Sequence, residues 1–123
     1  RCGPLLLAYD GSPSAREALR VSAELAKIWN TTCHVVYVAI KPEEEIINEA
    51  INYLKTNEIL YSLHIVNENS PTVGILTTAR EIPAELIVMG AFGKIRVHEW
   101  LLGSNTNSVI HTATCPILLT RLS

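Results

Sequence analysis

Short apolar runs alternate with segments of helical periodicity along the whole chain. Residues 5–9, LLLAY, are apolar throughout, which is typical of a strand covered on both faces of a sheet. Ser12 and Pro13 then form a helix start signal, and apolar or small residues recur at helical spacing as far as Trp29. The same succession predicts strands at 5–9, 33–40, 59–66, 84–90 and 116–121 and helices at 13–29, 41–55, 69–82 and from Ser104.

This alternation constrains the fold more than any other feature of the sequence. Parallel strands need crossover connections, so strands that are apolar on both faces and alternate with helices predict an α/β fold. The expected architecture is a three-layer sandwich in which helices cover both faces of a five-stranded parallel sheet. Open sheets of this kind bind ligands outside the carboxyl ends of their strands, where the strand order reverses. We therefore expect functional residues at strand ends.

Length and composition exclude several classes of protein. The 123 residues predict a single domain over 1–123, and 48% hydrophobic with 18% charged residues is typical of a core-forming chain. A net charge of −2 without a basic stripe argues against nucleic-acid binding, and the apolar runs are too short to span a membrane. The three cysteines are odd in number and form no CxxC pair, which favours a reducing compartment, the cytoplasm.

Asp10 follows the first predicted strand and is the only aspartate of the chain. A carboxylate held near the backbone can accept hydrogen bonds from a ribose hydroxyl or help to hold a metal. The alternative is a turn-forming aspartate in the sequence DGS. The residue type alone leaves both interpretations open.

The sequence MGAFGKIRVHEWLLGSNTN holds three of the six glycines, Gly90, Gly93 and Gly103. Without side chains, Gly90 and Gly93 allow backbone N–H groups to approach a bulky anion and permit positive φ. Gly103 precedes the last predicted helix, whose N-terminus, with the hydroxyls of Ser104 and Thr106, favours phosphate. The alternative is a loop with a glycine helix cap. Neither GxxxxGK[ST] nor GxGxxG is present, so neither standard nucleotide fingerprint applies.

The same glycine segment resembles a family motif. GAFGKIRVHEWLLGSNTNSV, residues 90–109, is similar to the G-x2-G-x9-G-[ST] nucleotide-binding motif of the universal stress protein family. LLLAYDGSPSAREAL, residues 5–19, resembles the opening strand and first helix of that family, and TATCPILLTR, residues 112–121, resembles its final strand. The likeness spans almost the whole chain, with the three regions in the same order.

This resemblance implies the strand order 3-2-1-4-5, with the reversal between the first and fourth strands. It also implies ATP binding, often with a divalent cation such as Mg or Mn on the phosphates, and a dimer built through the last strand. The implied site residues are Asp10 and Gly90 at the ribose, the Val38 backbone with Ala8 and Met89 at adenine, and Gly93, Gly103, Ser104, Asn105 and Thr106 at the phosphates.

Two features depart from the family pattern. The stretch between the second and third strands is short for the family, so we expect a more open rim on the adenine side of the pocket. The first residue is Arg1 rather than methionine, which fits one half of a tandem protein or a small member trimmed at its start. In a tandem protein, a sister domain would replace the second copy in the dimer.

Three functions follow as hypotheses. The leading one is an ATP-binding regulatory module in the stress response. The second is a slow phosphotransfer enzyme that hydrolyses ATP or modifies Ser104 or Thr106, for which only His98 and Glu99 are candidate bases within the loop. The third is a scaffold that associates through residues 116–121 and has a vestigial pocket.

No catalytic residue is assigned, and no metal held by protein side chains is expected. The four histidines show no i, i+3 or i, i+4 pairing along the sequence, which argues against a metal bound by protein side chains. They are His34, His64, His98 and His111.

Overall fold

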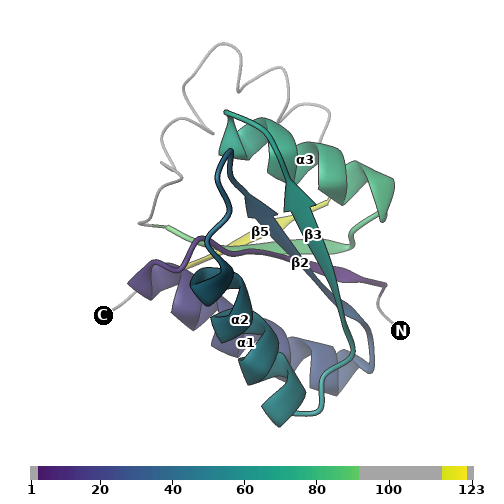
Figure 1. Ribbon diagram of the computed structural model, residues 1–123. Coiled ribbons are helices and arrows are strands. Elements are labelled where there is room, and N and C mark those ends of the chain that lie inside the picture. Colours follow the sequence, from purple (N-terminus) through teal and green to yellow (C-terminus); the bar gives the residue numbers. More distant parts are fainter. Residues whose placement is uncertain (1–2, 92–114, 122–123) are drawn as a thin grey trace.

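The computed structural model describes residues 3–91 and 115–121. Its strands form one sheet in the order β3-β2-β1-β4-β5, and all four neighbouring pairs are parallel (Figure 1). The predicted sheet and strand order are therefore confirmed. The strands are β1 (Leu5–Ala8), β2 (Cys33–Val38), β3 (Tyr61–Val66), β4 (Leu86–Gly90) and β5 (Ile117–Thr120).

Helices cover both faces of the sheet. The described helices are α1 (Pro13–Trp29), α2 (Glu44–Thr56) and α3 (Pro71–Glu81). Figure 1 shows α1 and α2 together on one face and α3 on the other. Strand β1 lies at the centre, and its side chains alternate between the two layers: Leu5 and Leu7 join the α1 side of the core, and Leu6 and Ala8 join the α3 side. The expected three layers are confirmed, and the continuous apolar run reflects burial on both faces.

Serine caps begin two of the helices, as the sequence predicts. The Ser12 hydroxyl accepts a hydrogen bond from the Ala15 N–H at 3.2 Å at the start of α1. The Ser70 hydroxyl accepts from the Val73 N–H at 3.3 Å at the start of α3. In both helices a proline follows the cap, where its missing N–H costs nothing. Because each helix follows a strand of the parallel sheet, both helix N-termini lie at the carboxyl edge.

The start of α2 differs from the prediction. The helix begins at Glu44 rather than at residue 41, and β2 ends at Val38 rather than at residue 40. Glu43 stays extended at φ −106° and ψ 113°, and its N–H donates to the Tyr37 hydroxyl at 3.2 Å. This contact satisfies the Glu43 N–H just before the helix begins. Hydrophobic periodicity does not reveal such a contact, so it placed the helix start too early.

Helix α3 approaches the sheet closely because it carries Gly74. A Cβ at Gly74 would lie 2.8 and 3.0 Å from the two methyl carbons of Val38. Val73, an apolar residue of this helix, is 39% exposed. The side of α3 that faces the sheet is formed by Gly74, Ile75 and Thr78, all buried.

The last predicted helix, from Ser104, lies outside the described residues. Across residues 3–91 and 115–121, none of the helices has the length and apolar composition that crossing a membrane requires.

Candidate functional site

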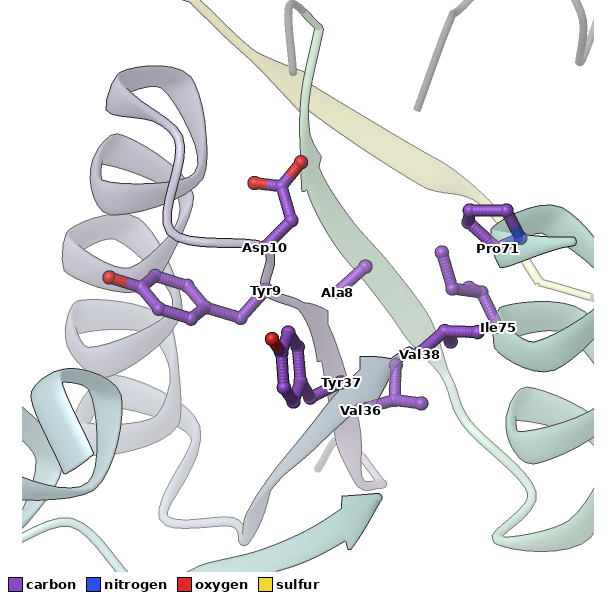
Figure 2. A pocket seen from close by; sticks show the side chains of 8 residues that line it. All are labelled: Ala8, Tyr9, Asp10, Val36, Tyr37, Val38, Pro71 and Ile75. Carbon is purple, nitrogen blue, oxygen red and sulfur yellow. The ribbon is translucent and has the colours of Figure 1, made fainter. Parts of the chain in front are cut away.

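A small pocket opens at the carboxyl ends of β1 and β2, beside the start of α3 (Figure 2). Its volume is about 40 Å³, which is space for roughly three water molecules. The residues that line it are Ala8, Tyr9, Asp10, Val36, Tyr37, Val38, Pro71 and Ile75. Ligands of open α/β sheets bind in this position, outside the strand ends.

The pocket forms because β1 ends before its neighbour β2 does. The last register pair of β1 with β2 joins Ala8 to Val36, whereas β2 continues alongside β3 as far as Val38. After one further ladder bond, from the Tyr9 N–H to the Val36 carbonyl at 3.0 Å, the chain turns away toward α1. The end of β2 is thus left without β1 beside it, and the side chains of α3 stand over the gap.

Asp10 turns the chain from β1 into α1. Its Oδ1 accepts a hydrogen bond from the Ser12 N–H at 2.9 Å, and Gly11 between them has a φ of +80°. That φ favours glycine, since side chains rarely adopt the left-handed region. The turn-forming interpretation of Asp10 is therefore correct, and the same carboxylate also lines the pocket.

The Tyr9 side chain of the pocket is anchored in the core on the α1 side of the sheet. In Figure 2 the Tyr9 side chain points away from Ala8 and Val38, toward the helices on the other face. Its hydroxyl donates to Glu49 of α2, which also accepts from the Arg16 Nε at 3.0 Å. Burial and the Glu49 hydrogen bond raise the pKa of Tyr9, so its hydroxyl stays protonated and donating.

Met89 and Gly90 lie one strand away, at the end of β4. Met89 pairs in register with Ala8 and is 1% exposed, beneath the strand ends rather than in the pocket lining. Gly90 packs against the first turn of α1: a Cβ there would lie 2.7 Å from the backbone nitrogen of Ala15 and from the carbonyl carbon of Ser14. Gly90 does not have a positive φ, so close approach rather than backbone conformation accounts for glycine at this position.

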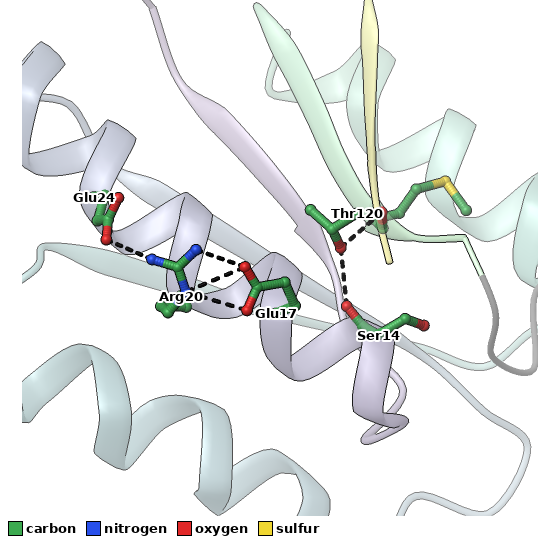
Figure 3. A network of polar contacts seen from close by, with 6 residues as sticks. Ser14, Glu17, Arg20, Glu24 and Thr120 are labelled. Atoms are coloured by element: carbon green, nitrogen blue, oxygen red, sulfur yellow. Dashed lines mark hydrogen bonds and ion pairs between the residues drawn. The ribbon is translucent and has the colours of Figure 1, made fainter. Parts of the chain in front are cut away.

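Thr120 of β5 contacts both the start of α1 and the end of β4. Its buried hydroxyl lies 2.9 Å from the Ser14 carbonyl oxygen and 3.4 Å from that of Met89 (Figure 3). One side chain thus joins β5, the first turn of α1 and the end of β4. Farther along α1, Arg20 forms surface ion pairs with Glu17 and Glu24, and such exposed pairs contribute little stability.

The structure brings together part of the predicted site. Ala8, Asp10 and Val38 line the same pocket, whereas Met89 and Gly90 lie at the adjacent strand end. The predicted phosphate-binding residues lie outside the described residues, namely Gly93, Gly103, Ser104, Asn105 and Thr106. Within the part of the chain that is described, no group of three or more His, Cys, Asp or Glu side chains is arranged to hold a metal ion.

Pro71 and Ile75 of α3 are pocket residues that the sequence interpretation missed. Strand order 3-2-1-4-5 contains the signal that would have found them. The connection from β3 to β4 must cross β2 and β1, so the helix within it lies over the ends of those strands. Tyr9, Val36 and Tyr37 were likewise not singled out.

Comparison with known proteins decides the family. The family profile described as "Universal stress protein family" matches residues 3–121. The chain belongs to the universal stress protein family. The resemblance seen in the sequence is thereby confirmed, and the strand order agrees with it.

Universal stress proteins from distant organisms match nearly the full chain. The Thermus aquaticus protein described as "Universal stress protein in QAH/OAS sulfhydrylase 3'region" is 31% identical over 134 residues, covering 95% of this chain and 97% of that protein. The structure of the Archaeoglobus fulgidus universal stress protein in complex with dAMP is 24% identical, with a TM-score of 0.71 and coverage of 95% and 96%. A universal stress protein in complex with cAMP is 21% identical, with a TM-score of 0.77 and coverage of 97% and 96%. Both structural likenesses show the shared fold.

Proposed function

We propose that the chain binds ATP at the pocket between β1, β2 and α3 and acts as a nucleotide-dependent regulatory module in the stress response. One observation carries the proposal. Ala8 and Asp10 at the end of β1 and Val38 at the end of β2, three of the residues that the sequence predicts at the nucleotide, line one pocket. In this proposal Asp10 accepts hydrogen bonds from the ribose hydroxyls, and Ala8 and Val38 contact adenine, with Met89 beneath.

The surroundings of the pocket suit an anionic ligand. Pro71, the first residue of α3, lines the pocket, and α1 begins three residues after Asp10. Helix N-termini carry partial positive charge and unpaired N–H groups, which favour phosphate. We assign the remaining phosphate contacts to Gly93, Gly103, Ser104, Asn105 and Thr106, with a Mg²⁺ or Mn²⁺ ion on the phosphates.

The ligands of two structural neighbours support an adenine nucleotide. The Archaeoglobus fulgidus protein is described in complex with dAMP and the second neighbour in complex with cAMP. Both ligands contain adenine, a sugar and one phosphate. ATP shares these groups, and its additional phosphates would extend toward the glycine segment.

ATP is expected to raise the thermal stability of the purified protein. A ligand present at a hundred times its dissociation constant adds about 2.7 kcal/mol to the free energy of unfolding. Thermal unfolding with ATP, and with GTP as a triphosphate control that changes only the base, measures this effect. Repeating the ATP titration with EDTA tests the divalent cation. An unchanged midpoint at millimolar ATP would contradict the proposal.

We further propose that β5 pairs with a second copy or with a sister domain. It is one of the two outer strands of the described sheet, and Leu118 and Leu119 are 39% and 43% exposed. Light scattering at micromolar protein is expected to give the mass of two chains. Replacing both leucines with lysine should reduce it to one. A wild-type mass of one chain would contradict homodimer formation.

The cytoplasm is the compartment that we propose. Cys33 is a free thiol, and burial raises its pKa to about 12, which keeps it unreactive. Free thiols persist in a reducing compartment. Fractionation of cells that express the native gene would test the assignment.

A further inference from the structure

Two histidines of neighbouring strands, His34 of β2 and His64 of β3, meet on one face of the sheet. The His34 Nδ1 and the His64 Nε2 lie 2.9 Å apart, and the two rings are stacked with centroids 5.1 Å apart and planes inclined by 28°. His34 is the second residue of β2 and His64 is the fourth residue of β3. Thirty residues of chain separate them, so no local spacing in the sequence indicates the pair.

The pair lies at an accessible position on the α3 side of the sheet. Residues two apart on a strand lie on the same face of the sheet, so His34 shares a face with Val36, and His64 with Val66. Val36 belongs to the core under α3, and Val66 packs against that core. Strand β3 is an outer strand of the sheet, and both histidines are only partly buried. The pair is therefore partly open to solvent.

The facing nitrogens are close enough together to bind one ion. With metal–nitrogen bonds of about 2.05 Å, two ligands are about 2.9 Å apart at right angles and about 3.3 Å apart around a tetrahedral ion. The observed 2.9 Å is set by the hydrogen bond between the rings and lies near both spacings, so one ion can contact both nitrogens once the rings turn toward it. Nitrogen ligands bind Cu²⁺ most tightly among the divalent first-row ions, and Ni²⁺ comes directly before it in that series.

We propose that His34 and His64 form a two-histidine site for a divalent transition ion, Ni²⁺ or Cu²⁺, with water in the remaining positions. On binding, both rings rotate so that the lone pairs of the facing nitrogens point to one ion. The ring that donates the hydrogen bond changes tautomer and carries its proton on its other nitrogen, so both rings stay neutral. Imidazole is a ligand that suits these ions.

The protonation state of the pair favours this exchange. Burial, together with the proximity of His64, lowers the pKa of His34. The ring is then neutral at neutral pH, which is the form that binds metals. The parallel register of β2 and β3 brings both histidines together before the ion arrives, so the second ligand needs little further ordering.

Titration with NiCl₂ and CuCl₂ tests the site. One bound ion per chain is expected at neutral pH, measured by calorimetry, and the Cu²⁺ form should show nitrogen ligands in its electron paramagnetic resonance spectrum. His34→Gln and His64→Gln are each expected to weaken binding roughly 100-fold, because the second ligand of a linked pair acts at high effective concentration.

The chain offers matched controls in its other two histidines. His98→Gln and His111→Gln should leave the affinity unchanged, and the thermal midpoint of each variant without metal shows whether it folds. Zn²⁺ is expected to bind more weakly than Cu²⁺. The proposal fails if wild type binds neither Ni²⁺ nor Cu²⁺ at millimolar concentration, or if either control weakens binding as much as His34→Gln.

Discussion

Gly90→Ala is expected to lower the free energy of unfolding by about 3 kcal/mol in the absence of any nucleotide. The added Cβ would meet main-chain atoms of Ser14 and Ala15, two of them at 2.7 Å. Main-chain atoms in the first turn of a helix cannot rotate away as the end of a flexible side chain can. The turn itself must move, and the Thr120 hydrogen bond to the Ser14 carbonyl must move with it. Chemical denaturation of the unliganded protein measures the loss.

Gly74→Ala is the matched control for this experiment. Its Cβ would meet side-chain atoms of Val38 at 2.8 and 3.0 Å, and alanine gains about 1 kcal/mol of helix propensity over glycine. Against an overpacking cost of about 2 kcal/mol, the net loss should be about 1 kcal/mol. If Gly90→Ala were no more destabilising than Gly74→Ala, the close packing of β4 on α1 would not be the reason for glycine at position 90.

Much of the fold could be predicted because the sequence encodes it locally. The apolar run of β1 reflects burial on both faces, and Ser12 and Ser70 cap α1 and α3 through hydrogen bonds that span only three residues. Helix α2 shows the limit of such signals. Its start depends on Tyr37, which lies six residues before Glu43 and reaches it only because β2 and α2 are neighbours in space.

The candidate site could be predicted only in part, for the same reason. Asp10 and Gly90 stood out by residue type, but residue type does not tell a contact with ligand from a contact within the protein. The structure gives Gly90 a packing partner in α1, which accounts for glycine without any ligand. Ile75 and the His34–His64 pair depend on strand order and register, so they become visible only in three dimensions.

Asp10→Asn is expected to reduce ATP affinity by roughly 10 to 100-fold, because a hydrogen bond to a charged group contributes about 1.5–3 kcal/mol and each 1.4 kcal/mol is tenfold. Asparagine keeps an oxygen at the same position, so it can still accept the hydrogen bond of the Ser12 N–H that now measures 2.9 Å. The turn into α1 should persist, and the free energy of unfolding without nucleotide should change little. Calorimetric titration of ATP into both proteins measures the affinity.

Ser12→Ala is the complementary variant, because it should lower the stability of the fold and leave ATP affinity unchanged. It removes the hydroxyl that accepts from the Ala15 N–H, which should cost about 1 kcal/mol of stability. It leaves the Ser12 N–H and the Asp10 carboxylate in place, so ATP affinity should be preserved. A ribose role for Asp10 requires this crossed result, with affinity lost in one variant and stability lost in the other. If Asp10→Asn instead lost stability and kept its affinity, the carboxylate would serve the turn alone, and the nucleotide would have to be held by other residues.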